Sequence, residues 1–181
     1  MNGRIPTRVL AEAGVMIALA TALNAIKVFT FPEGGSITLG AMVPLLFFAL
    51  RRGAKAGVVG GAVFGIIDVY FEPFVYNPFQ FLLDYPLAFG ALGLAGLFKG
   101  RWEGRGPQGL VTVIGVAAGI AGRYCFHFLS GLVFFASYAP AGESPALYSA
   151  IYNASYLIPE FVISAAVIFA LANRGALKTA L

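Results

Sequence analysis

Side chains that could bind a polar ligand lie close together in the stretch R-Y-C-F-H-F-L-S-G at 123–131. Arg123 carries a permanent positive charge, and His127, the only histidine of the chain, can donate or accept hydrogen bonds. Gly119, Arg123, His127 and Gly131 recur every four residues, so a helix would place them on one slowly drifting stripe. Glycines above and below the charged pair would let a ligand or another backbone approach closely. The stripe therefore predicts a binding surface.

Further polar side chains interrupt otherwise apolar segments. They are Lys27, Asp68, Asp84, Asn153 and Glu160. Polar groups inside a membrane are costly, face the interior of the helix bundle and indicate function by default. The alternative is an ion pair of Arg123 with Asp84 or Glu160 that only holds the helices together.

The segments around these residues are typical of an integral membrane protein. The chain has 181 residues, is 59% hydrophobic and 11% charged, and has a mean hydropathy of +0.84. A soluble domain is about 45–50% apolar and about 25% charged. At roughly 20 residues per span, residues 1–181 accommodate about six membrane helices in a single domain. Strand periodicity is absent, so we expect an all-α membrane protein.

The apolar runs predict six transmembrane helices, at about 9–29, 37–50, 54–71, 77–98, 108–135 and 149–172. We expect the first run to be a span and not a cleaved signal peptide, because no convincing cleavage site followed by a soluble domain is evident. Small residues at helical spacing indicate close helix packing. They are Gly57, Gly60, Gly61, Gly65, Gly115, Gly119 and Gly122.

Charged residues between the spans predict the orientation of the chain. With the N-terminus inside, the outer segments hold Glu33, Glu72 and Glu143 and no basic residue. The inner segments hold Arg4, Arg8, Arg51, Arg52, Lys55, Lys99, Arg101, Arg105, Arg174 and Lys178. Basic residues concentrate in cytoplasmic segments, so we expect both termini in the cytoplasm. The net charge of +4 then reflects topology, and we expect no nucleic-acid partner.

The predicted topology brings the polar residues to similar depths in the outer half of the membrane. At 1.5 Å per residue, Asn153 lies about 6 Å below the outer surface, Asp84 and His127 about 10–12 Å, and Glu160 and Arg123 about 16–18 Å. Aromatic residues are dense around the outer ends, although an ordinary interfacial belt of aromatic side chains is an equal alternative for any one of them. We predict an outward-facing pocket for a flat ligand with polar edges, including a cationic one.

The sequence lacks the motifs of several other classes. It has no G-x-x-x-x-G-K-[ST], so ATP hydrolysis by that route is excluded. With one histidine and one cysteine, we expect no metal site. An intramembrane hydrolase built on Ser130, His127 and Asp84 is disfavoured, because no G-x-S-x-G is present and Ser130 lies three residues from His127. A gradient-driven transporter working alone is disfavoured by the lack of a detectable inverted repeat. We therefore predict no catalytic residues and a partner or gradient that supplies the energy.

The first predicted span carries small residues at four-residue intervals, Gly14, Ala18 and Ala22. Such a face permits close contact with another helix. We interpret it as a partner-docking face, with packing inside this chain as the alternative.

Several strings resemble one family over essentially the whole chain. They are P-E-G-G-S-I-T-L-G-A-M-V-P at 32–44, Q-F-L-L-D-Y-P-L-A-F-G at 80–90, H-F-L-S-G at 127–131, Y-A-P at 138–140 and Y-N-A-S-Y-L-I-P-E at 152–160. The chain resembles the thiamin-specific S-component of energy-coupling factor transporters. The resemblance implies a six-helix subunit of the prokaryotic cell membrane that binds thiamin from outside, as ligand and not as cofactor. It also implies docking through the first helix on a transmembrane coupling subunit with two ATPase subunits.

The resemblance implies a set of ligand-binding residues. They are Asp84, Tyr85, Arg123, His127, Gly131, Phe135, Tyr148 and Asn153. An acidic group and Asn153 would surround the aminopyrimidine, aromatic rings would stack on the ligand, and the positive group would reach the hydroxyethyl end. Glu160 is left as a structural partner. This chain departs from the family at three of these positions: the family usually has Glu where this chain has Asp84, Lys where it has Arg123, and Trp where it has Phe135. The alternative ligands are hydroxymethylpyrimidine and riboflavin.

Overall fold

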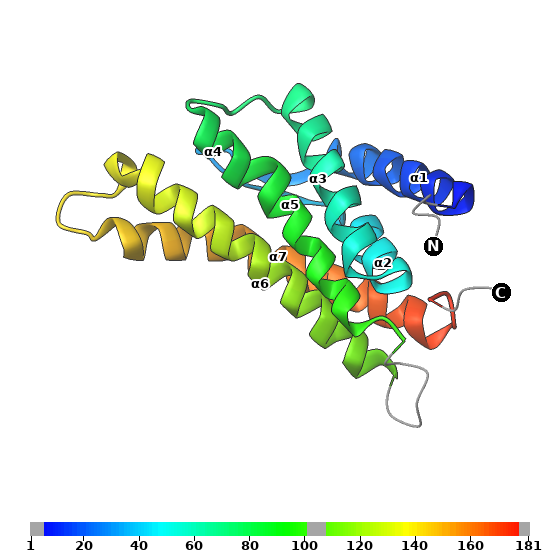
Figure 1. Cartoon of the computed structure of the whole chain (residues 1–181). Coiled ribbons are helices and arrows are strands. Elements are labelled where there is room, and N and C mark those ends of the chain that lie inside the picture. Colours follow the sequence, from blue (N-terminus) through cyan, green and yellow to red (C-terminus); the bar gives the residue numbers. More distant parts are fainter. Residues whose placement is uncertain (1–5, 101–107, 178–181) are drawn as a thin grey trace.

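The computed structural model describes residues 6–100 and 108–177, in which helices dominate. In chain order the elements are α1 (Thr7–Asn24), β1 (Lys27–Thr30), β2 (Ser36–Thr38), α2 (Met42–Arg52), α3 (Ala54–Phe71), α4 (Pro78–Leu82), η1 (Leu83–Leu87), α5 (Ala88–Ala91), η2 (Leu92–Phe98), α6 (Gln108–Phe134), η3 (Ala136–Tyr138) and α7 (Pro145–Asn173). The predicted inner residues Arg4, Arg101, Arg105 and Lys178 lie outside the described residues. Both ends of the described chain lie at one end of the molecule, and the turn between α6 and α7 lies at the other (Figure 1).

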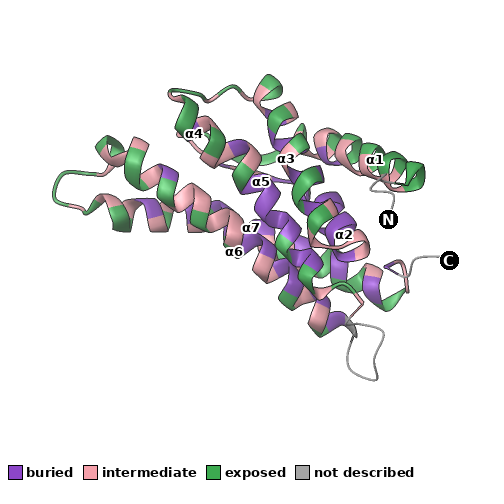
Figure 2. Cartoon of the chain, in the orientation of Figure 1, coloured by how far each residue is buried: buried purple, intermediate pink, exposed green. Residues whose placement is uncertain are grey.

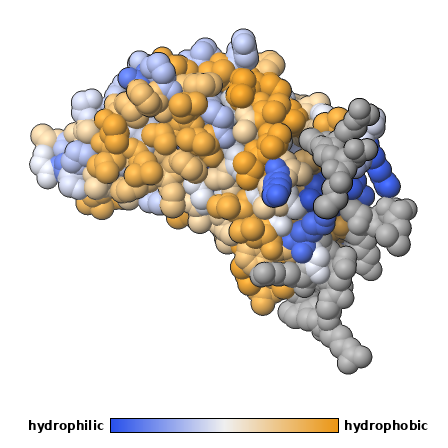
Figure 3. Space-filling model, viewed as in Figure 1, coloured by the Kyte–Doolittle hydropathy of each residue, from blue (hydrophilic) through white to orange (hydrophobic). Residues whose placement is uncertain are grey.

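Five helical stretches in the described residues are long and apolar enough to cross a membrane. They are α1, α3, Pro78–Phe98 (α4 to η2), α6 from Gly109, and α7. The predicted span at 37–50 is helical only from Met42, because residues 36–38 form β2, and the resulting helix α2 has only 11 residues. At 1.5 Å per residue α2 is about 16 Å long, well short of the roughly 30 Å hydrocarbon core. Hydrophobic residues cover much of the face seen in Figure 3, and the most hydrophilic ones gather near the chain termini.

Within the described residues the fold is all-α, as expected, apart from one short antiparallel β-hairpin between α1 and α2. The helix α1 ends at Asn24, not near 29, and Lys27–Thr30 pairs with Ser36–Thr38 in the register Lys27↔Thr38 and Thr30↔Ser36. The hairpin is held by contacts with distant helices: the Glu160 carboxylate of α7 accepts hydrogen bonds from the backbone N–H and the hydroxyl of Thr38 (Oγ1 to Oε1, 2.6 Å). Glu160 is therefore a structural partner of the hairpin, as the sequence predicted.

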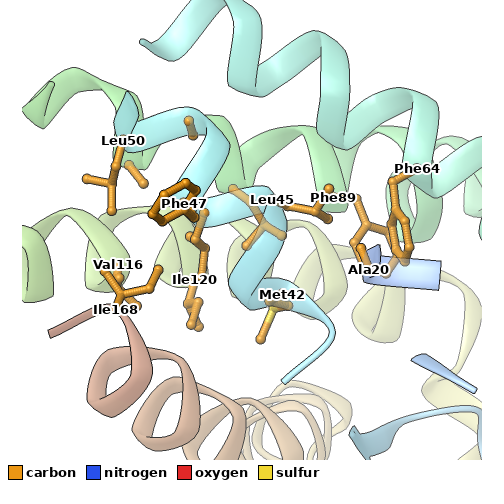
Figure 4. Close-up of a cluster of buried hydrophobic side chains, with 14 of the residues drawn as sticks. Ala20, Met42, Leu45, Phe47, Leu50, Phe64, Phe89, Val116, Ile120 and Ile168 are labelled. Carbon is orange, nitrogen blue, oxygen red and sulfur yellow. The ribbon is translucent and has the colours of Figure 1, made fainter. Parts of the chain in front are cut away.

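The helix α2 is the centre of the hydrophobic core. Its residues Met42, Leu45, Leu46 and Leu50 are buried, and Figure 2 shows α2 mostly in the colour of buried residues. In the close-up of Figure 4 the labelled side chains of α2 lie between those of α6 and α7 on one side and those of α1, α3 and α5 on the other. The core thus holds the longer helices around a short central one.

Glycines bring α3 against the helical stretch Pro78–Phe98. A Cβ atom at Gly61 would overlap the carbonyl oxygen of Phe89, and one at Gly65 would overlap that of Tyr85. Each position therefore requires the absence of a side chain, as the glycine spacing predicted. Through these contacts α3 supports the backbone of η1, which carries Asp84 and Tyr85.

We expect Gly61→Val to lower the unfolding midpoint of the detergent-purified protein by about 5–10 °C, because overpacking costs about 1–3 kcal/mol. A thermal melt followed by light scattering measures the change. Val59→Leu is the matched control, since Val59 is 60% exposed on the same helix. Equal midpoints for Gly61→Val and the wild type would contradict the close approach of the two helices.

Candidate functional site

A cavity of about 390 Å³ lies between the hairpin and the ends of the helices that face away from the chain termini. Its volume is within the range of small-molecule sites. All eight ligand-binding residues predicted above line it: Asp84, Tyr85, Arg123, His127, Gly131, Phe135, Tyr148 and Asn153. The structure thus brings together positions from η1, α6 and α7, and Phe135 directly after α6, although they are distant in sequence.

Asp84 and Tyr85 lie in η1, a turn of π-helix. Pro86 explains the irregular turn, because it has no backbone N–H for the hydrogen bond that a regular α-helix would need there. Such turns are frequent at functional sites. The turn presents both side chains to the cavity.

A chain of hydrogen bonds joins Arg123, His127 and Asp84. Arg123 Nε donates to His127 Nε2 (3.1 Å), and His127 Nδ1 lies 3.2 Å from Asp84 Oδ1. An arginine can only donate, so His127 Nε2 is the acceptor and Nδ1 carries the proton that is donated to Asp84. Ser130 Oγ donates to Asp84 Oδ2 at 2.8 Å. Ser130 and His127 therefore both bond to Asp84, whereas in a hydrolytic triad the serine would bond to the histidine.

Carboxylates outnumber cations in the cavity lining. The acidic lining residues are Glu33, Asp68, Glu72 and Asp84, and the basic ones are Lys27 and Arg123. Lys27 forms an ion pair with Glu72, and the Arg123 guanidinium lies 4.0 Å from the centre of the Phe89 ring. The excess of negative charge suits a cationic ligand. Among the described residues, no cluster of three or more His, Cys, Asp or Glu side chains could hold a metal ion.

The α7 side of the cavity is built from tightly bonded polar groups. Asn153 Nδ2 donates to the carbonyl of Ser149 (2.9 Å), and Asn153 Oδ1 accepts from the hydroxyl of Tyr156 (2.6 Å). Asn153 Oδ1 keeps a second lone pair with which it can accept a hydrogen bond from a ligand. Gly131 lines the cavity, but a Cβ there would overlap Ser149 Oγ, so its small size makes room for α7 as well as for a ligand.

Aromatic rings form the rest of the cavity wall. Phe135 stacks on Phe74, with ring centroids 5.9 Å apart and an interplanar angle of 16°. The ring centroids of Tyr148 and Tyr152 are 5.9 Å apart. The hydroxyl of Tyr152 accepts a hydrogen bond from the backbone N–H of Glu33 (3.0 Å) in the hairpin turn. The two sets of rings can contact the flat faces of a ligand.

The predicted docking residues lie apart from the cavity. Gly14, Ala18 and Ala22 are exposed on α1, and nothing lies within 4 Å of a Cβ built on Gly14. Packing inside this chain therefore does not explain the small residues.

Sequence reasoning missed several lining residues, of which Gln80 and Phe89 are the most closely connected to the site. Gln80 is four residues before Asp84, a spacing that places both on one helix face, and this signal could have identified it. Phe74 belongs to the aromatic residues expected around the outer ends, but its contact with Phe135 had no sequence signal, because it lies in an irregular segment between α3 and α4.

Comparisons with known proteins agree with one another. A family model described as "Thiamine transporter protein" matches residues 10–179. The thiamine transporter ThiT of Bacillus subtilis is 35% identical over 168 residues, which cover 88% of this chain and 87% of that protein. ThiT of Lacticaseibacillus paracasei is 31% identical over 170 residues, covering 88% and 84%. The solved structure of ThiT from Listeria monocytogenes has the same fold, with a TM-score of 0.82, 24% identity, and coverage of 94% of this chain and 97% of that one.

Proposed function

This chain belongs to the thiamine transporter protein family, and we propose that its cavity binds thiamin through the eight lining residues named above. It is a multi-pass membrane protein and a transport protein, not an enzyme. Thiamin joins an aminopyrimidine to a positively charged thiazolium that carries a hydroxyethyl arm. The single observation that supports these residues most strongly is their convergence on one acidic, aromatic cavity.

Each part of thiamin finds suitable chemistry in the cavity. Asp84 Oδ1 can accept from the amino group of the pyrimidine, and the carboxylates Asp68 and Glu72 can stabilise the thiazolium charge. The rings of Phe135 and Tyr148 can stack on the two heterocycles. Arg123, next to His127, can donate to the hydroxyethyl oxygen. No further cofactor is needed for binding.

We infer that the chain crosses the cell membrane of a prokaryote six times, with both termini in the cytoplasm and the cavity open to the outside. The passage of β2 and α2 from the cavity end to the opposite end would complete the sixth crossing (Figure 1). Basic residues at the ends of α2 and α7 and acidic residues at the cavity end support this orientation.

We also infer that uptake requires an energy-coupling factor module of one transmembrane coupling subunit and two ATPase subunits. The exposed face of Gly14, Ala18 and Ala22 supports docking through α1. The lack of an ATP-binding motif in the sequence agrees with energy from a partner.

Isothermal titration calorimetry of the detergent-purified protein tests the ligand. We expect saturable binding of thiamin well below micromolar concentrations, and binding of hydroxymethylpyrimidine at least about tenfold weaker, because the pyrimidine lacks the charge that the acidic lining favours. Riboflavin is the control for a flat ligand without a thiazolium. Equal affinity for thiamin and hydroxymethylpyrimidine would contradict a site that recognises the thiazolium charge. Saturation by riboflavin alone would make riboflavin the ligand.

A further inference from the structure

Gln80 is a buried amide whose every polar atom is used. Its side chain is only 1% exposed. Nε2 donates to Asp84 Oδ2 (2.6 Å) and to the carbonyl of Phe74 (2.9 Å), and Oε1 accepts from the backbone N–H of Tyr76 (3.1 Å). A buried amide is costly unless it is hydrogen-bonded, so the full set of bonds fixes both the amide and its partners.

The bond to Asp84 fixes the orientation of the ligand-binding carboxylate. Oδ2 of Asp84 accepts from Gln80 and from Ser130 Oγ (2.8 Å), whereas Oδ1 has His127 as its one hydrogen-bonding partner among the described residues. The Gln80 contact is the shortest of the three. With both donors on Oδ2, the carboxylate is held with Oδ1 available to a ligand, and little rearrangement is needed on binding.

The other two bonds of Gln80 fix an irregular segment of the cavity wall, residues 72–76. The Glu72 N–H still bonds to the Asp68 carbonyl of α3, but the later backbone groups of this segment bond to side chains of the next helical stretch. Tyr85 Oη completes the set, since it donates to the carbonyl of Glu72 (2.6 Å) and accepts from the N–H of Phe74 (3.0 Å). The segment carries the ring of Phe74 that stacks on Phe135.

We propose that Gln80 is a positioning residue that couples the polar and the aromatic parts of the binding site. It holds Asp84 in the orientation that receives the ligand and at the same time holds Phe74 against Phe135. The inference rests on the proposed function, because thiamin binding is its readout. It adds a specific residue, outside the ligand-contacting set, on which affinity depends.

Two variants separate this role from simple packing. Gln80→Met keeps the volume but removes all three hydrogen bonds, and we expect it to weaken thiamin binding about 10- to 30-fold. Gln80→Glu is isosteric and still accepts from the Tyr76 N–H, but it cannot replace both hydrogen bonds donated by Nε2, because a carboxylate donates none and a protonated carboxyl group donates one. We expect it also to weaken binding about tenfold, whereas a packing role would be preserved by the isosteric side chain. Phe79→Met on the same helix, 70% exposed and outside the cavity, is the matched control and should bind like the wild type.

A double-mutant cycle measured by calorimetry gives the decisive result. If Gln80 acts through Asp84, Gln80→Met will weaken binding far less in the Asp84→Asn background than in the wild type. Thermal melts of the ligand-free proteins check that all variants are folded. Wild-type affinity in folded Gln80→Met, or fully additive effects in the cycle, would overturn the inference. Absence of thiamin binding by the wild-type protein would instead overturn the proposed function.

Discussion

Replacing Asp84 with asparagine is expected to weaken thiamin binding about 100-fold, which corresponds to about 2.8 kcal/mol. The carboxylate accepts hydrogen bonds from Gln80, Ser130 and His127, and asparagine has only one side-chain oxygen with which to accept them. The side-chain nitrogen of the asparagine would face at least one of these donors without a hydrogen bond. The negative charge that attracts a cationic ligand would also be lost. Calorimetric titration of the purified variant with thiamin measures the change.

His127→Ala should weaken binding by more than about tenfold, less than Asp84→Asn, because it removes the residue that links Arg123 to Asp84 but leaves the carboxylate. Glu143→Gln, which removes an acid from the segment before α7 and outside the cavity lining, is the matched control. Wild-type affinity in both Asp84→Asn and His127→Ala would remove the assignment of this cavity as the thiamin site.

Much of the site could be predicted because its polar residues follow helical periodicity. Arg123 and His127 are four residues apart on one long helix, and the apolar residues around them make their positions conspicuous. The helix α3 runs from Ala54 to Phe71, as expected, because Gly53 with φ of 97° ends the preceding helix. Local signals of this kind depend on neighbouring residues only.

The β-hairpin could not be predicted, because the contacts that hold it are not local in sequence. Its strands have four and three residues, too few for a clear alternation, and Lys27–Thr30 continues the apolar run of α1. The contacts that stabilise it are distant in sequence, such as Thr38 with Glu160 and the turn with Tyr152. Asp68 was expected as a polar residue inside a predicted span, with no partner from the first helix. In the structure Asn24 Nδ2 donates a hydrogen bond to Asp68 (2.7 Å) where α1 ends beside α3. Tertiary contacts therefore decide where α1 stops and the cavity begins.

Ala18→Trp is expected to leave thiamin binding by the isolated protein unchanged and to reduce uptake to the level of cells that lack the protein. Ala18 is exposed on α1, far from the cavity lining, so a large side chain there requires no rearrangement inside this chain. A helix contact built on small residues requires close approach of the two backbones, which an indole would prevent. Calorimetry on the purified variant and uptake of labelled thiamin by cells that produce it together with the coupling module measure the two effects separately.

Leu19→Trp is the matched control for this prediction, because Leu19 is also exposed on α1 but lies about 100° around the helix from Ala18. It places the same indole in the same helix turn and should support uptake at the wild-type level. If Ala18→Trp also supports normal uptake, α1 does not dock through its small residues. If both variants bind thiamin and neither transports it, the contact covers more of α1 than the face of Gly14, Ala18 and Ala22. Loss of uptake in Ala18→Trp alone, with binding intact, would separate ligand recognition from coupling and assign them to different residues of this small protein.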